Sequence, residues 1–275
     1  MTKTNEFNKF FDKIFVINLF DRPERWEKVD KQFKRRGITA DRFVAVDGRC
    51  KGQGDKACEQ KRKTFEIAYQ VDIPNPKGYP LKELVPASSL TIGTILILRE
   101  QVRMGWKHVL ICEDDIYMTR NVEKKLKQGI EELGNTKWDI LYLGCGNLCG
   151  NKGVDWEYNS EKQKYLAPLA REELHSDYYT YHQNDLRLPC DDGCEEFSDH
   201  LSYTDHAGGT WCYGVSLAGA KKMLKALDNN AGNHIDHLLA ENIKKGKMIS
   251  LAFDPPIVVH ESIIGGRNTD IPWAW

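Results

Sequence analysis

The residues best suited to chemistry are three adjacent carboxylates, Glu113, Asp114 and Asp115. They follow an apolar run from His108 to Cys112, a pattern typical of a strand buried in a parallel sheet. Carboxylates this close repel one another, and a cation relieves the repulsion. Ligands of open α/β sheets bind beyond the carboxyl ends of the strands. We therefore expect a Mn²⁺ or Mg²⁺ site here, because both ions accept oxygen ligands.

Alternation along an extended chain places Glu113 and Asp115 on one face and Asp114 on the other. Asp115 is the expected metal ligand, with Glu113 or Asp114 assisting. His260 ends the last predicted strand and is a candidate third ligand, since imidazole binds Mn²⁺. The alternatives are an acidic strand end that starts a solvated loop and a histidine with a purely structural role.

Two arginines, Arg22 and Arg25, follow the first predicted strand. Their guanidinium groups are suited to phosphate oxygens, which accept charge-assisted hydrogen bonds. The alternative is an amphipathic helix whose first turn carries solvent-facing charges.

A second candidate site is the segment from His234 to His237, which contains Asp236. Histidines three apart on a helix face the same side, so His234 and His237 are a candidate metal pair. We favour Asp236 as the functional residue, because an inverting group transfer needs a carboxylate that activates the acceptor hydroxyl. The competing interpretation is that Asp236 caps a helix.

Strands that alternate with helices predict an α/β fold with a mostly parallel central sheet. The predicted strands are 13–19, 43–46, 108–112, 139–144, 211–216, 249–253 and 257–260, and the predicted helices are 23–37, 88–104, 122–133, 217–227 and 235–243. Residues 49–81 and the polar, aromatic stretch 145–208 are expected to be irregular excursions.

Charge and composition limit the classes of function. The 275 residues include 39 Lys plus Arg and 40 Asp plus Glu, a balance that argues against a general nucleic-acid binder. No apolar run approaches the roughly 20 residues of a membrane helix, so no integral membrane segment is expected. The segment from Met1 to Phe15 is too charged for a signal peptide. The default expectation is a cytoplasmic protein.

The chain has eight cysteines, and two pairs have a three-residue gap, Cys145 with Cys149 and Cys190 with Cys194. Two such pairs are compatible with a four-thiolate zinc site, and an even count is compatible with disulfides. We favour reduced thiols, because no secretory context is visible.

Several short motifs follow one another along the chain. They are Ile17-Asn18-Leu19, Arg22-Pro23-Glu24-Arg25, Ala45-Val46-Asp47-Gly48, Glu113-Asp114-Asp115, Trp138-Asp139-Ile140-Leu141-Tyr142-Leu143-Gly144, Tyr213 to Leu224, Ile235-Asp236, His260 and Thr269-Asp270. In these motifs and in their order the chain resembles glycosyltransferase family 25. One departure is clear: where the family has Ser-His in the helix before the acidic motif, this chain has Gly93-Thr94.

The resemblance implies a single GT-A-like nucleotide-sugar-binding domain over 1–275, with 145–208 as a variable insertion on the acceptor side. It implies metal-dependent transfer of a hexose, galactose or glucose, from a UDP-sugar to a hydroxyl of a glycan or glycosylated protein, with inversion. Mn²⁺ is the expected cofactor, with Mg²⁺ as the alternative. The metal ligands would be Asp115, Glu113 and His260, the catalytic base Asp236, and the donor-binding residues Ile17, Asn18, Leu19, Arg22, Arg25, Asp47, Glu113 and Asp114. The alternatives are a non-catalytic glycan- or nucleotide-binding relative, which the missing Ser-His favours, and another phosphate chemistry such as nucleotidyl transfer.

Overall fold

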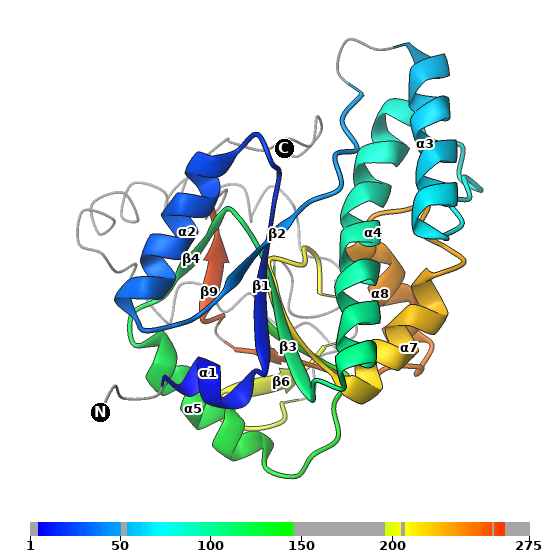
Figure 1. The fold of residues 1–275 in the computed structure, drawn as a ribbon. Coiled ribbons are helices and arrows are strands. Elements are labelled where there is room, and N and C mark those ends of the chain that lie inside the picture. Colours follow the sequence, from blue (N-terminus) through cyan, green and yellow to red (C-terminus); the bar gives the residue numbers. More distant parts are fainter. Residues whose placement is uncertain (1–4, 51–53, 146–195, 205–206, 255, 262–275) are drawn as a thin grey trace, which may run out of the picture.

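A mixed sheet of seven strands forms the centre of the protein (Figure 1). The computed structural model describes residues 5–50, 54–145, 196–204, 207–254 and 256–261. In spatial order the strands are β2 (Asp41–Val44), β1 (Lys13–Asn18), β3 (His108–Glu113), β7 (Cys212–Ser216), β5 (Ile140–Gly144), β8 (Ser250–Phe253) and β6 (Leu201–Tyr203). Only β7 and β6 run against the others in this sheet. The predicted α/β class with a mostly parallel central sheet is confirmed.

Helices cover both faces of the sheet (Figure 1). One face carries α1 (Glu6–Phe10), α2 (Pro23–Arg35) and α5 (Val122–Leu133), and the other carries α3 (Asp55–Tyr69), α4 (Leu81–Met104), α7 (Leu217–Leu227) and α8 (Ile235–Lys244). The pleat of β3 divides its side chains between two cores. Val109 and Ile111 join the core under α4, whereas Leu110 and Cys112 join the core under α2 and α5.

The prediction that residues 49–81 are irregular is wrong, because this segment contains α3 and the start of α4. Of the fifteen residues of α3, only Cys58 and Phe65 are buried, so its apolar periodicity is weak. Helix α4 begins at Leu81 rather than Ser88 and contains Pro86. Proline usually marks a helix boundary, and here it lies beyond the first turn.

The predicted excursion at 145–208 also needs correction at its described ends. Cys145 is buried directly after β5, and Leu201–Tyr203 pairs with β8 as the edge strand β6. These ends are therefore parts of the core. The remaining positions of the two cysteine pairs, Cys149, Cys190 and Cys194, lie outside the described residues, as does Thr269-Asp270.

Helix α4 is long and apolar enough to cross a membrane, and it is the one described helix of this kind. However, 61% of its most apolar 18-residue window is buried inside the protein. It contributes Ile92, Ile95 and Leu98 to the core and packs against α3 and α7. Its apolar surface is thus used in tertiary packing.

The close approach of α7 to the sheet gives a stability prediction. Gly219 lies in the first turn of α7, and a Cβ atom there would overlap the backbone carbonyl of Asp139. We expect Gly219→Ala to lower the free energy of unfolding by about 2–3 kcal/mol, because backbone cannot move aside. Gly93→Ala in α4 is the matched control, since its Cβ would meet only the Phe43 ring at 3.6 Å. Alanine favours helix, so the control should be neutral or stabilising by up to about 1 kcal/mol. Urea denaturation measures both, and equal stability of the two variants would contradict the packing.

Candidate functional site

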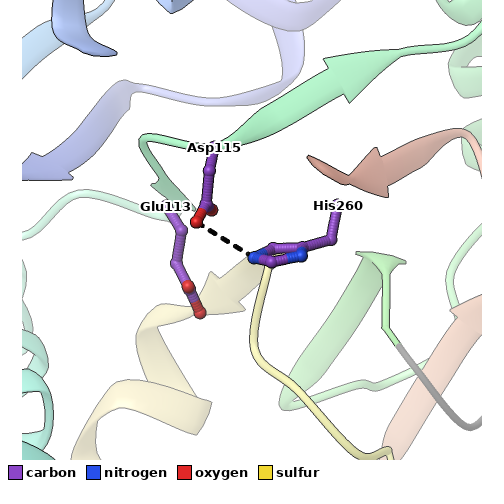
Figure 2. Close-up of side chains that lie close together, drawn as sticks. All are labelled: Glu113, Asp115 and His260. Atoms are coloured by element: carbon purple, nitrogen blue, oxygen red, sulfur yellow. Dashed lines mark ion pairs between the residues drawn. The ribbon is translucent and has the colours of Figure 1, made fainter. Parts of the chain in front are cut away.

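The acidic triplet lies where β3 ends: Glu113 is the last residue of the strand, and Asp114 and Asp115 follow it in a turn. Asp114 faces α2, as Leu110 and Cys112 do, and bonds to residues of β1 and α2. Glu113 and Asp115 point toward His260 (Figure 2). The ligand atoms of these three residues all lie within 4.8 Å of one another. The structure thus brings together the three predicted metal ligands, which are 147 residues apart in sequence at their extremes (260 − 113).

A second, two-stranded sheet brings His260 to the triplet. The chain turns after Asp115 into β4 (Ile116–Met118), which pairs antiparallel with β9 (Val258–His260). Ile116 pairs in register with His260, and the Glu261 amide donates to the Asp115 carbonyl at 2.8 Å. These backbone bonds hold the His260 ring so that its Nε2 lies 3.0 Å from Asp115 Oδ2.

Arg25 neutralises the triplet from the α2 side. Its Nη1 donates to Asp114 Oδ1 at 2.8 Å, and its Nη2 donates to Asp115 Oδ2 at 3.1 Å. Asn18 Nδ2 donates to Asp114 Oδ2 at 2.6 Å and to the Arg22 carbonyl at 2.9 Å. Arg25 is only 7% exposed, so it is an internal countercharge and not one of the solvent-facing charges of an amphipathic helix.

The carboxylates of the triplet have different pKa values. Burial, together with repulsion from Asp115, raises the pKa of Glu113 to about 8. Burial raises the pKa of Asp114 to about 6, although Arg25 and Asn18 oppose the rise. Burial also acts to raise the pKa of Asp115, but His260 and Arg25 outweigh it and lower this pKa below its usual value. Asp115 is therefore the most readily ionised of the three carboxylates, and Glu113 the least.

The pKa of His260 is raised, although burial alone would lower it, because Asp115 and Glu113 favour the protonated ring. A protonated ring donates its Nε2–H to Asp115. Imidazole ligates a metal only in its neutral form, so a metal ion would replace this proton.

One buried carboxylate oxygen of the triplet has no hydrogen-bond partner among the described residues. Asp115 Oδ1 is buried and accepts no hydrogen bond from any described residue. A buried carboxylate oxygen without a donor is costly, and a cation would satisfy it. Two carboxylates and an imidazole form a donor set suited to Mn²⁺. The residues present therefore fit a divalent cation.

A short loop before β7, residues 207–211, touches three groups of the site. The Gly209 amide donates to Asp236 Oδ2 at 3.0 Å, and the Thr210 hydroxyl lies 3.5 Å from Glu113 Oε1. The Trp211 ring stacks on His260 with ring centroids 5.3 Å apart. Sequence reasoning missed this loop, and its signal was the Gly208-Gly209 pair just before a predicted strand.

Asp236 lies in the first turn of α8, but it is not the helix cap. His234 occupies the N-cap position. The Asp236 carboxylate accepts from the Gly209 amide at 3.0 Å and from the His237 amide at 2.9 Å. Its charge is among the causes that raise the pKa of Glu113, which places it near the triplet. The metal-ligand cluster found among the described residues does not include His234 or His237.

The other predicted donor residues lie along the same edge of the sheet. Ile17 pairs in register with Glu113 of β3, and the Ala45 amide donates to the carbonyl of Asn18 at 2.9 Å. Leu19 follows Asn18 and is half-buried. The ends of β1 and β2 therefore flank the acidic triplet.

Asp47 lies just beyond β2 and is bound by Arg49, a residue that sequence reasoning missed. Arg49 donates to both carboxylate oxygens of Asp47 at 2.9 and 2.8 Å and to Asp21 Oδ2 at 2.8 Å. These hydrogen bonds lower the pKa of Asp47. Arg49 thus joins the loop after β1 to the loop after β2.

Curated relatives confirm the family resemblance. No family model matches the chain. A glycosyltransferase 25 family member of Drosophila melanogaster is 32% identical over 144 residues, 48% of this chain and 21% of the relative. A "probable inactive glycosyltransferase 25 family member 3" of Bos taurus is 28% identical over 223 residues, 78% of this chain and 29% of the relative. The matches thus span less than a third of the length of these relatives.

Solved structures give only a weak likeness. Mouse xyloside xylosyltransferase 1 in its apo form is 8% identical, with a TM-score of 0.32 over 85% of this chain and 69% of that chain. The fold class therefore rests on the sheet topology described above and not on this likeness.

The role of Arg25 as internal countercharge gives a prediction. We expect Arg25→Met to lower the free energy of unfolding by about 3 kcal/mol, because it leaves Asp114 and Asp115 buried without their cation. Arg103→Met is the control, since the ion pair that Arg103 forms with Glu100 is exposed and its loss should change stability by less than about 0.5 kcal/mol. Urea unfolding curves compare them. An Arg25 variant as stable as the control would show that other groups balance the triplet.

Proposed function

We infer, because the chain is homologous to members of the glycosyltransferase 25 family, that it is a glycosyltransferase. More specifically, we propose that it catalyses metal-dependent transfer of galactose or glucose from a UDP-sugar to a hydroxyl of a glycan or glycosylated protein, with inversion. The observation that carries the proposal is the convergence of Glu113, Asp115 and His260 at the carboxyl edge of the sheet. Ligands of open α/β sheets bind at this edge.

We assign Mn²⁺ to this cluster, with Mg²⁺ as the alternative. Asp115 supplies Oδ1, the buried oxygen that has no partner among the described residues. Glu113 supplies a second carboxylate, and His260 supplies a nitrogen that favours Mn²⁺ over Mg²⁺. When bound, the ion would neutralise negative charge that develops on the leaving diphosphate.

The donor is proposed to lie along the ends of β1 and β2, across Ile17, Asn18, Leu19 and Asp47. The two arginines then have different roles. Arg25 acts through the triplet, because both its Nη atoms hold carboxylates. Arg22 has the more exposed side chain, 19% against 8%, and is assigned to the diphosphate, where a guanidinium stabilises developing charge.

The proposed reaction needs a base on the acceptor side. The acceptor hydroxyl attacks the anomeric carbon, the bond from that carbon to the diphosphate oxygen breaks, and the hydroxyl proton passes to a carboxylate. Glu113 and Asp115 face His260 and are committed to the cation. Asp236 reaches the same region from α8, and the Gly209 amide fixes its orientation at 3.0 Å. We assign the base to Asp236.

The test of the function is release of UDP from a panel of UDP-sugars. Purified protein would be incubated with UDP-galactose, UDP-glucose and other UDP-sugars, with and without Mn²⁺, and with EDTA. We expect release from a UDP-hexose that depends on Mn²⁺. No release from any donor, with or without simple sugar acceptors, would contradict the enzymatic proposal.

Asp115→Asn tests the metal assignment. The change removes a hard anionic ligand at nearly constant shape, so Mn²⁺ binding should weaken on the order of 100-fold and UDP release should be lost with it. Glu261→Gln is the matched control, because this neighbouring carboxylate pairs with Lys28 and lies outside the cluster. Calorimetry measures the metal affinity of both variants directly. Equal affinity for Mn²⁺ would place the ion elsewhere.

Asp236→Asn tests the base. An amide still accepts the Gly209 hydrogen bond but cannot take a proton, so kcat should fall by about 10²–10⁴ with Mn²⁺ and UDP affinity kept. Asp228→Asn is the control, since Asp228 pairs with Arg99 near the protein surface. A decrease of less than tenfold in kcat would assign the proton transfer to another group.

A non-catalytic relative is the second candidate, because the relative from Bos taurus is named probable inactive. The absence of the family's Ser-His, where this chain has Gly93-Thr94, favours the same candidate. Thr94 there is buried, and its hydroxyl lies 3.2 Å from the Tyr213 hydroxyl, so it is engaged in the core. The two functions separate in one assay, since a binding relative would bind UDP without releasing it from a donor sugar.

A further inference from the structure

Two cysteines face each other beneath the acidic triplet. Cys112 is the residue before Glu113, and Cys212 is the residue after Trp211. They are register partners on the antiparallel strands β3 and β7, and their Sγ atoms lie 2.8 Å apart. Both side chains have no exposed surface, and both thiols are free in this structure. Non-bonded carbon atoms pack at roughly 3.5–4.0 Å and sulfur is larger, so the pair is closer than two thiols pack.

The strand register suits a covalent bond between them. The Glu113 amide donates to the Trp211 carbonyl at 2.8 Å, so the adjacent pair, Cys112 with Cys212, is the non-hydrogen-bonded kind. In such pairs the Cα atoms are about 4.5 Å apart, which lies within the range that a disulfide spans. Both side chains belong to the core on the α2 side of the sheet, so they leave their strands on the same face.

We propose that Cys112 and Cys212 form a cross-strand disulfide. The bond forms by thiol–disulfide exchange with a small disulfide such as oxidised glutathione. One cysteine sulfur attacks a glutathione sulfur, and one glutathione thiol leaves. The second cysteine sulfur then attacks the mixed disulfide, and the second glutathione thiol leaves. Two cysteine thiols are oxidised, one glutathione disulfide is reduced, and their two protons end on the glutathione thiols.

The surroundings set the rate of this exchange. Burial, together with Cys112, raises the pKa of the Cys212 thiol, so the reactive thiolate is scarce in the folded protein. A bulky reagent reaches the pair only when β3 and β7 separate locally or before the sheet closes. The bond is therefore expected to form readily during folding and slowly afterwards, and to resist reduction once made.

The bond would act on the strand ends that carry the site. It lies one residue from Glu113 on β3 and one residue from Trp211 on β7, and Trp211 stacks on His260. It would also close a loop between positions 100 apart in sequence, which restricts the unfolded chain. It therefore stabilises the central strand pair of the sheet. This inference does not depend on the transferase assignment.

Peptide mapping tests the bond in the unmodified protein. The chain is refolded in glutathione redox buffer, alkylated under denaturing conditions without reductant, and cut with trypsin and a glutamate-specific protease. Cleavage after Glu196 separates Cys212 from Cys190 and Cys194, so each peptide of interest holds one cysteine. We expect peptide 108–113 linked to peptide 197–221 and lost on reduction. Alkylated Cys112 and Cys212 with no linked peptide would overturn the proposal.

Thermal unfolding supplies the second measurement. Reductant should lower the Tm of the oxidised wild type by on the order of 10 °C. The variant with Cys112→Ala and Cys212→Ala should show no such shift. The variant with Cys50→Ala and Cys58→Ala, two other buried cysteines, is the matched control and should keep it. The reverse pattern would assign the stabilisation to the other pair and contradict the proposal.

Discussion

The arrangement of the site depends on the electrostatic cost of placing three carboxylates at the end of one buried strand. Asp114 and Asp115 are each less than a tenth exposed, so water cannot screen their charges. The fold compensates with Arg25 from α2 and His260 from β9. Helix α2 and the β4–β9 sheet are therefore held to the strand end by charge as well as by apolar packing.

The hydrogen bonds of the carboxylates then give them different tasks. Asp114 is turned toward α2, where Asn18 and Arg25 satisfy both of its oxygens. Asp115 shares Arg25 but keeps one oxygen without a partner among the described residues. Together with Asn18, Arg25 therefore satisfies both oxygens of Asp114, but on Asp115 it binds Oδ2, which leaves Asp115 Oδ1 able to bind a cation. This division explains why Arg25 does not reach outward as a phosphate ligand.

Much of the fold was predictable because local pattern and tertiary structure agree. Helix α7 occupies the predicted range Leu217–Leu227, and its Ser216 cap accepts from the Gly219 amide at 3.0 Å. The continuous apolar run of β3 predicted a strand buried on both faces. Helix α3 was missed because a mostly exposed helix carries little apolar periodicity, and the short strands β4 and β6 were missed because three residues carry no period at all.

The site was predictable only in part, for a related reason. Residue type and position after a strand predicted the triplet, but Asp114 and Asp115 lie in a turn, where the alternation of an extended chain does not apply. No local pattern shows that Ile116 pairs with His260, since the register between distant strands is a tertiary property. The internal role of Arg25 was equally hidden, because an arginine in the first turn of a helix is usually exposed.

The loop before β7 contacts both the proposed base, Asp236, and the proposed metal ligand, His260. Gly209 has φ +73°, and a Cβ atom there would lie 2.6 Å from Nε1 of Trp211. Only glycine fits both constraints, because side chains disfavour this backbone conformation and the indole fills the space. Since the Gly209 amide holds Asp236 and Trp211 stacks on His260, a change in this turn moves the base candidate and the metal candidate together. The loop 207–211 therefore supplies one contact to the base candidate and one to the metal candidate.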